Sequence, residues 1–280
     1  MNKKYQDKVT SNEIGLEIGL VLSRFFFNTE HLHFGYWPDN LSLSIDNLKQ
    51  AQDYHSDQII NAIPKNVDTI LDVGSGSGGL AEKLIEKKYK VECVSPSEYL
   101  SDAIEKKLIN KVKVHRSTFE NLNIDKKFDF VIFSESFQYV NIQKTLSKVP
   151  NFLNKNSHFL ICDFFRKPGT GNKLLGGGHA WDEFYNEISS TSFENILDQD
   201  ITIETARTYD LINKIINNVA EPVRDLSAKY LESNYPKMMK LLRWYLDQKI
   251  KRINRIYFSG NMTGETFINL KTYRLLLYKL

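Results

Sequence analysis

The 280-residue sequence contains only two cysteines, Cys93 and Cys162, and each lies inside an apolar run. They are therefore expected to be reduced core residues and not a disulfide. No stretch reaches the roughly 18 consecutive apolar residues of a membrane-spanning helix, and residues 1–7 lack the apolar core of a secretory signal. These absences predict a cytoplasmic protein without a transmembrane segment.

The chain also lacks a strong excess of charge of one sign. Its net charge is +3, with 41% hydrophobic and 25% charged residues. Nucleic-acid-binding domains are usually much more basic, so no nucleic-acid partner is expected. The composition is typical of a globular protein, and the length allows one large domain or one domain with a cap.

Glycine is scarce, with 14 residues, but four of them follow one apolar run closely. Residues 69–79 read Thr-Ile-Leu-Asp-Val-Gly-Ser-Gly-Ser-Gly-Gly, and residues 80–88 are predicted to be helical. A strand, a glycine turn and a helix N-terminus can hold a phosphate or a nucleoside, because glycine lets the backbone approach a ligand. Gly74, Gly76 and Gly79 also satisfy the G-x-G-x-x-G dinucleotide pattern.

Asp72, two residues before the first glycine, favours a different cofactor. The string from Asp72 to Gly78 resembles motif I of the class I S-adenosylmethionine (SAM) dependent methyltransferases. In that family the acid faces the cationic methionine end of the cofactor, and the glycines admit its ribose and methionine. The resemblance implies SAM as cofactor and S-adenosylhomocysteine (SAH) as product. The residues that it implies for cofactor binding are Asp72, Gly74, Ser75, Gly76 and Gly78.

An aromatic loop precedes this core. Residues 12–28 have apolar residues at helical spacing, and residues 31–38 then read His-Leu-His-Phe-Gly-Tyr-Trp-Pro. The loop resembles the H-x-G-Y-W segment of small-molecule methyltransferases such as sugar O-methyltransferases, tocopherol-type C-methyltransferases and cyclopropane fatty acid synthases. There it folds over the SAM site, which implies cofactor contacts for Tyr36 and Trp37. A buried aromatic staple is the alternative for Trp37.

Two histidines in this loop are also of interest. His33 is a candidate substrate contact. His31 and His33 lie two residues apart, a spacing that could hold a metal, but no cysteine or carboxylate partner follows them. No metal site is therefore expected.

The next predicted strands, residues 91–94 and 111–115, lead to the ribose and adenine positions. Ser95-Pro96-Ser97 resembles a variant of the T-x-S string that cyclopropane synthases and tocopherol-type enzymes carry in place of the usual acid. Glu98 is either a displaced cofactor ligand or an ordinary helix-start charge. Residues 117–122 resemble the adenine-reading string G-D-A-E-N-L, with Thr118 in place of the acid and a backbone contact retained at Phe119. Candidate cofactor residues here are Ser95, Pro96, Glu98, Thr118 and Phe119.

A buried strand at residues 128–133 ends in the string Ser-Glu-Ser-Phe-Gln-Tyr-Val. Ligands of parallel sheets bind beyond the carboxyl ends of the strands. Ser134 is therefore a cofactor candidate and Glu135 a catalytic one, although a helix cap and first-turn acid would also explain the pair. Gln138 and Tyr139 replace the Glu-His pair of cyclopropane synthases, which argues against their bicarbonate mechanism. Gln138 is a substrate candidate and Tyr139 a catalytic one.

Two glycine-rich runs, residues 168–171 and 176–178, follow the predicted strand 157–164. They are expected to form a lid or a loop shaped by substrate. His179 comes directly after them and could accept a proton from the substrate. A surface-loop histidine is the alternative.

The order of elements predicts a doubly wound α/β fold. We expect a seven-stranded, mostly parallel sheet with an antiparallel C-terminal strand over residues 267–280, and a helical cap inserted between strands six and seven. The expected parts are an N-terminal cover (1–64), a SAM-binding core (65–204), a substrate cap (205–256) and the last strand (257–280). Tyr209, Trp244 and Tyr245 are expected to line the cap's substrate pocket.

The predicted cap helix at residues 236–257 has a basic face opposite its apolar stripe. This face is either a solvated surface or a weak docking site for an anionic lipid or a carrier protein. The sequence thus predicts methyl transfer from SAM to an O, N or C atom of a small apolar, amphipathic or anionic metabolite. Two alternatives stay open, a catalytically silent SAM-binding regulator and a nicotinamide-dependent dehydrogenase.

Overall fold

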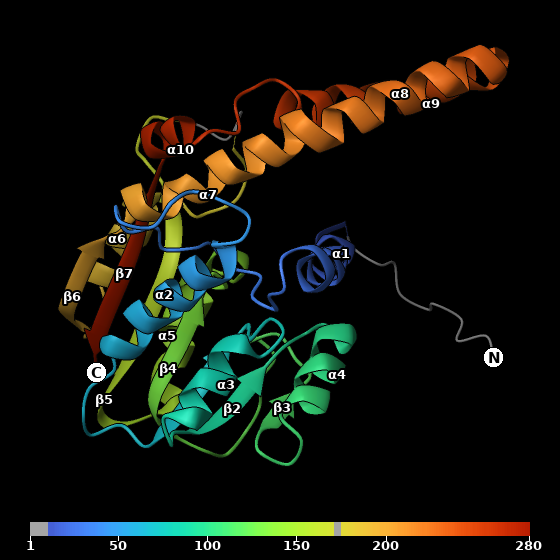
Figure 1. Cartoon of the computed structure of the whole chain (residues 1–280). Helices are drawn as coiled ribbons and strands as arrows, with labels where there is room; N and C mark the ends of the chain where they lie inside the picture. The colour runs from blue at the N-terminus through green and yellow to red at the C-terminus, as the bar shows by residue number, and fades with distance from the viewer. Residues whose placement is uncertain (1–10, 171–174) are drawn as a thin grey trace.

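The computed structural model describes residues 11–170 and 175–280, and over these ranges it has one seven-stranded sheet between layers of helices (Figure 1). The strand order is β3-β2-β1-β4-β5-β7-β6. The first strand, β1, therefore lies in the middle of the sheet. Strands β2 and β3 extend the sheet on one side of it, and strands β4 to β7 extend it on the other side. The strands are β1 (Thr69–Val73), β2 (Lys90–Val94), β3 (Lys113–His115), β4 (Phe128–Ser134), β5 (Leu153–Arg166), β6 (Glu194–Asp200) and β7 (Lys271–Lys279).

Strands β1 to β5 pair in parallel, whereas β7 runs antiparallel between β5 and β6. The predicted seven-stranded sheet with an antiparallel C-terminal strand is thus confirmed. The order of strands reverses between β1 and β4, where the connections leave in opposite directions. In open sheets of this kind, ligands bind beyond the strand ends at such a reversal.

The helices alternate with the strands, as the sequence predicts for the core. They are α1 (Ser11–Phe26), α2 (Leu48–Asn61), α3 (Gly79–Glu86), α4 (Glu98–Lys107), α5 (Ile142–Phe152), α6 (Trp181–Ser189), α7 (Thr202–Ile215), α8 (Glu221–Asn234), α9 (Pro236–Tyr257) and α10 (Gly264–Leu270). A short 3-10 turn covers Phe137–Tyr139, and a π-helical segment, Ile216–Ala220, joins α7 to α8.

The expected last strand, residues 267–280, is partly wrong. Its first residues, from Phe267 to Leu270, belong to helix α10, and strand β7 begins only at Lys271. The Thr263 side chain caps this helix, because its Oγ1 accepts a 3.1 Å hydrogen bond from the backbone N–H of Thr266. This local cap overrides the alternation of apolar residues that predicted a strand.

The central strands are buried on both faces, so alternate side chains enter two separate cores. Ile70 of β1 packs in the core beneath α2, α3 and α4, and its neighbour Leu71 packs in the core beneath α5 and α6. Cys93 and Cys162 are buried free thiols in the first of these cores, as expected.

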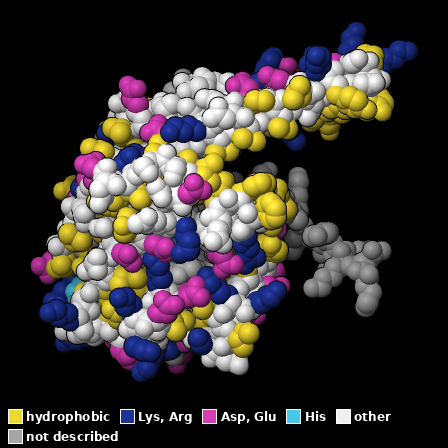
Figure 2. All heavy atoms as spheres, viewed as in Figure 1, with side chains coloured by type: hydrophobic (Ala, Val, Ile, Leu, Met, Phe, Trp, Pro, Cys, Tyr) yellow, Lys and Arg dark blue, Asp and Glu magenta, His cyan; other side chains and the backbone are white. Residues whose placement is uncertain are grey.

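The predicted helical insertion lies between β6 and β7 in the chain. Its helices α8 and α9 form an arm that projects from the body above α1 (Figure 1), and no residue of either helix is buried. Apolar side chains follow the underside of this arm, and further apolar side chains gather on the facing part of the body (Figure 2). The outer face of α1 contributes exposed side chains of Ile18, Val21 and Phe25.

Two expectations concern residues outside the described ranges. The first is that residues 1–7 lack the apolar core of a secretory signal. The second is the lid or substrate-shaped loop expected from the glycine-rich run 168–171, whose last residue lies outside the described ranges. Across the described part of the chain, every helix falls short of the length and apolar character required to cross a bilayer.

Candidate active site

The glycine turn after β1 has the backbone geometry that its sequence predicts. Gly74, Gly76 and Gly78 all have positive φ angles, of 74°, 55° and 81°, which residues with a Cβ rarely adopt. A Cβ on Gly74 would lie 2.3 Å from the Cβ of Ser136, so glycine is also needed for close packing of the turn after β4. At Gly76 the nearest atom is 4.0 Å away, in Leu32. The backbone there is bare and open to a ligand.

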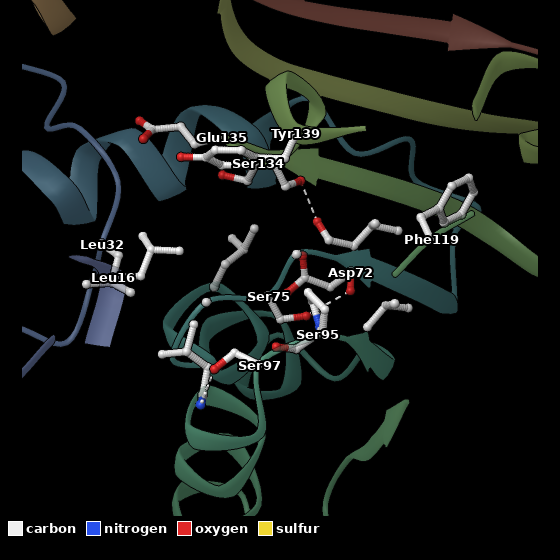
Figure 3. Close-up of a pocket in the computed structure, with 18 of the residues that line it drawn as sticks. Leu16, Leu32, Asp72, Ser75, Ser95, Ser97, Phe119, Ser134, Glu135 and Tyr139 are labelled. Atoms are coloured by element: carbon white, nitrogen blue, oxygen red, sulfur yellow. Dashed lines mark hydrogen bonds between the residues drawn. The ribbon is translucent and has the colours of Figure 1, made fainter. Parts of the chain in front are cut away.

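A cavity of about 460 Å³ lies beyond the carboxyl ends of β1, β2 and β4, at the point where the strand order reverses. Its volume falls within the roughly 300–1,000 Å³ of small-molecule sites. In Figure 3, Ser134, Glu135 and Tyr139 lie on one side of the cavity, and Ser75, Ser95 and Ser97 lie on the opposite side. Leu16 of α1 and Leu32 of the aromatic loop line a further side of it.

Asp72, the last residue but one of β1, also lines this cavity. Only 1% of its surface is exposed, and burial raises the pKa of its carboxyl group to about 7. Its Oδ2 atom has no hydrogen-bond partner among the described residues. A buried carboxylate oxygen without a partner is costly, and a cationic ligand group in the cavity would satisfy it.

The second wall is built from the residues that follow β2 and β3. Ser95 is buried and its backbone N–H donates to the carbonyl of His115 at 3.0 Å, which fixes it at the cavity. Pro96, Thr118 and Phe119 also line the cavity, as predicted. Ser97 was not predicted as a site residue, although it stands in the string that pointed to Ser95.

Glu98 does not reach the cavity. Its side chain is 77% exposed and forms a 2.5 Å ion pair with Arg116. The structure therefore places it as the first-turn acid of α4, the alternative that the sequence left open.

Glu135 has a strained backbone, with φ at +51°, directly after β4. Such strain in a residue with a Cβ is typical of functional positions. Its Oε1 accepts hydrogen bonds from the Tyr273 hydroxyl (2.7 Å) and the Phe34 backbone N–H (2.6 Å). The packed surroundings disfavour the charged carboxylate and raise the pKa of Glu135 to about 8. Glu135, predicted as a catalytic residue, thus lies in the cavity wall with a raised pKa.

Of the two candidates in the turn after Glu135, Tyr139 lines the cavity and Gln138 does not. Tyr139 lines the cavity and is more than half exposed. Gln138 is held by Asp163, whose Oδ2 accepts from its backbone N–H at 2.9 Å, and it does not line the cavity. Burial raises the pKa of Asp163 to about 7.

Several predicted site residues lie away from the cavity. Trp37 is 1% exposed, and its indole N–H donates to Thr208 at 3.0 Å, which makes it the buried aromatic staple considered above. Neither Tyr36 nor Gly78 lines the cavity. The Nε2 of His179 donates to the Phe137 carbonyl at 2.9 Å, so this ring is bound to the 3-10 turn.

The three residues of the predicted substrate pocket are not brought together. Tyr209 on α7 is buried and stacks on Phe267 with ring centroids 5.0 Å apart. Trp244 and Tyr245 lie on the projecting arm and are 77% and 78% exposed. Of the predicted substrate contacts, His33 alone lines the cavity.

Sequence reasoning also missed residues that line the cavity, one from α1, which was not assigned to the site, and two from the aromatic loop, where other residues were expected to make the contacts. Leu16, His31 and Leu32 come from α1 and the loop after it. The apolar spacing of α1 was visible, but nothing local indicated which of its faces meets the cavity.

A comparison with protein families gives a match for this region. Residues 70–156 match the family model described as a methyltransferase domain. The match runs from β1 to the start of β5 and includes the glycine turn, Ser95 and Glu135. No curated protein sequence matches the chain.

Solved structures share the fold over nearly the whole chain. A geranyl diphosphate C-methyltransferase from Streptomyces coelicolor A3(2), crystallised with Mg²⁺, geranyl-S-thiolodiphosphate and SAH, is 14% identical at a TM-score of 0.67, covering 98% of this chain and 99% of that one. A mycolic acid cyclopropane synthase complexed with SAH and CTAB is 16% identical at 0.67, covering 98% and 100%. A [4+2]-cyclase is 12% identical at 0.64, covering 98% and 97%.

Proposed function

We propose that this chain, a class I methyltransferase by its domain match and its fold, transfers a methyl group from SAM to a small metabolite. The observation that carries the proposal is the pairing of Asp72 with the bare turn at Gly76. An unpartnered buried carboxylate oxygen suits the ammonium group of the methionine moiety. The open backbone at Gly76 admits the cofactor beside it.

The remaining walls suit the rest of the cofactor. Ser95 and Ser97 line the cavity at the end of β2, where the Ser95 hydroxyl would support a ribose, while the Ser97 Oγ caps α4 by accepting from the backbone N–H of Leu100. Phe119 is fully buried and offers an apolar face and a backbone amide to the adenine. SAM fits this arrangement better than a dinucleotide, because a pyrophosphate would lie near the carboxylate of Asp72.

Methyl transfer is an in-line displacement at the methyl carbon. The bond from this carbon to sulfur breaks, a bond to the acceptor atom forms, and SAH leaves. The enzyme contributes mainly by holding the acceptor in line and by excluding water. Leu16 and Leu32, which line the cavity, would help to exclude water from it.

An O–H or N–H acceptor must also lose a proton, and Glu135 is the group best placed to take it. Its carboxyl lines the cavity, and a pKa of about 8 makes it a stronger base than an ordinary glutamate. Tyr139 lies on the same wall and would orient the acceptor. We assign His179 the role of fixing the turn at Phe137, through its hydrogen bond to that carbonyl.

We further propose that the acceptor is apolar or amphipathic. Apolar side chains lie along the underside of the arm and on the part of the body that faces it (Figure 2), and Leu16 of α1 lines the cavity. The basic residues of α9, such as Lys240 and Arg243, would suit a weak contact with an anionic lipid or a carrier protein.

The first experiment is calorimetric titration with SAH and with NAD. SAH should bind in the micromolar range or tighter, and NAD should not bind. Radiolabelled SAM is then supplied with a panel of phenols, terpenoids and fatty acyl compounds, and label transfer is measured. Failure to bind SAH would reject the proposal.

A second candidate, a SAM-binding protein that does not transfer methyl groups, is favoured by two observations. Ser95 and Thr118 stand where the family usually has acids, and a protein with this fold is described as a [4+2]-cyclase. Tight SAH binding without label transfer to any acceptor would favour this candidate.

A further inference from the structure

Three side chains with metal-binding atoms meet at the edge of the cavity. His33 comes from the aromatic loop, His55 from α2, and Glu135 from the turn after β4. One ligand atom from each of the three lies within 4.8 Å of the other two. The sequence alone shows no cysteine or carboxylate partner for His31 and His33. The fold, however, brings His55 and Glu135 close to His33.

The hydrogen bonds of His33 fix its tautomer. Its Nδ1 lies 2.8 Å from the carbonyl oxygen of Phe34, which can only accept, so Nδ1 carries the proton. The lone pair is then on Nε2, which accepts a 3.0 Å hydrogen bond from Nδ1–H of His31, a bond that a metal ion at Nε2 would replace. Metal-binding histidines are usually held in this way, with the second ring nitrogen donating to a carbonyl.

The hydrogen bonds around His55 leave one of its nitrogens unsatisfied. The Tyr273 hydroxyl donates to Glu135, so it must accept from Nε2–H of His55, 2.9 Å away. Nδ1 then carries a lone pair, and it has no hydrogen-bond partner within residues 11–170 and 175–280. His55 is completely buried. A buried imidazole nitrogen without a partner is costly, and an ion bound at this nitrogen would satisfy it.

The donor set selects the kind of ion. Two imidazole nitrogens and one carboxylate suit zinc, ferrous iron or cobalt, whereas Mg²⁺ prefers oxygen ligands only. The thiol of Cys162 lies 3.4 Å from Nε2 of His55 and adds a soft group to the surroundings. Two of the three ligands, His33 and Glu135, also line the cavity, so an ion here would have open positions towards it.

We propose that His33, His55 and Glu135 bind one divalent transition-metal ion, zinc being the reference case, at the wall of the cofactor cavity. The inference goes beyond the proposed function, because transfer from SAM does not itself require a metal. An ion at this place would coordinate an oxygen or nitrogen of the acceptor and make it lose its proton more readily. Glu135 would then act as a ligand, and the ion would take over the task of activating the acceptor.

The test uses the full chain, freed of metal with EDTA and titrated with Zn²⁺ by calorimetry. Co²⁺ is titrated in parallel, since its visible absorption bands report nitrogen ligation and coordination geometry. The expected result is one equivalent of Zn²⁺ per chain and cobalt bands, with binding more than about tenfold weaker in His33→Ala, His55→Ala and Glu135→Gln. Mg²⁺ should give no comparable heat.

The matched control is His115→Ala. His115 lies on the edge strand β3, and its Nε2 is 2.6 Å from the carboxylate of Glu92, so the substitution breaks a second, partly buried His–Glu pair. Zinc binding should be unchanged in this variant. Wild-type protein that binds no zinc would overturn the proposal, and so would zinc binding that survives all three ligand substitutions. Glu135→Gln preserves the size of the side chain, so it gives an answer even if His55→Ala does not fold.

SAH titration in the presence of EDTA separates this inference from the proposed function. If SAH binds normally while zinc does not, the metal site is rejected, and methyl transfer with Glu135 as base still stands. If SAH fails to bind while zinc binds as predicted, the proposed function is rejected and the metal site still stands.

Discussion

The Tyr273 hydroxyl donates a 2.7 Å hydrogen bond to the carboxylate of Glu135, although the two residues are 138 positions apart in the chain. The contact exists because β7 runs beside β5, which is itself paired with β4. The C-terminal strand therefore directly supports the carboxylate that we propose as the base. Because the hydrogen bond stabilises the charged form, it lowers a pKa that burial raises.

Tyr273→Phe should therefore shift the pH dependence of methyl transfer. Removal of the hydroxyl leaves Glu135 with less stabilisation of its charge, so its pKa should rise above about 8. A general base acts only when ionised, and activity should increase with pH through this pKa. The rising limb of the pH–rate profile, measured with an acceptor from the radiolabel screen, should move to higher pH by up to about one unit. SAH affinity at pH 7 should be the same in the variant and in the wild type. A rising limb at the same pH in both proteins would count against Glu135 as the base.

Asp72→Asn should weaken SAH binding. The substitution removes the negative charge opposite the ligand's ammonium group, and charge-assisted hydrogen bonds contribute roughly 1.5–3 kcal/mol, or about 10- to 150-fold in affinity. The matched control is Glu86→Gln, an exposed acid at the end of α3. Calorimetry at pH 8 gives both affinities. Equal SAH binding by Asp72→Asn and wild type would remove the main support for the cofactor assignment.

The same carboxyl group should make the stability of the ligand-free protein depend on pH. Its folded pKa of about 7 lies above the ordinary value of 3.8, so the folded state binds more protons than the unfolded state between these values. The free energy of unfolding contributed by this group therefore falls as pH rises from about 4 to 7. Asp72→Asn removes that dependence. Relative to wild type, the variant should gain roughly 2 kcal/mol more at pH 8 than at pH 5.5, since 1.4 kcal/mol corresponds to one pKa unit. Urea unfolding at both pH values measures this difference, and a constant difference would show that Asp72 is not perturbed.

Gly76→Ala tests the bare backbone of the turn, and Gly169→Ala is its matched control. Both glycines have positive φ, 55° and 75°, and a Cβ on either would meet no atom closer than 4.0 Å. Each substitution should therefore cost about 1 kcal/mol of stability through backbone strain alone. Only Gly76→Ala should also weaken SAH binding, by at least about tenfold, because its methyl group enters the cavity. Equal SAH affinities of the two variants would mean that the cofactor does not approach this turn.

Local strings in the sequence were enough to locate one half of the site. Asp72 is near the end of β1, the glycines and Ser95 directly follow their strands, and the parallel sheet brings the carboxyl ends of those strands together. His55 and Tyr273 could not be predicted, since each reaches the site through packing between distant elements. The same limit applies to apolar stripes. A stripe shows which face of α1 or α9 is apolar, but not whether another element covers it, and in both helices it is largely exposed.

The arm provides the last prediction. Trp244 and Tyr245 are exposed on α9, so replacing both with alanine should change the free energy of unfolding by less than about 0.5 kcal/mol. If the arm contacts the acceptor, as expected of a substrate cap, the double variant should raise the acceptor KM several-fold while SAH affinity stays constant. Tyr185→Ala, another exposed aromatic residue but on α6, is the control and should leave KM unchanged. An unchanged KM in the double variant would mean that these two aromatic side chains do not contact the acceptor. A loss of SAH affinity instead would mean that the arm acts on the cofactor and not on the acceptor.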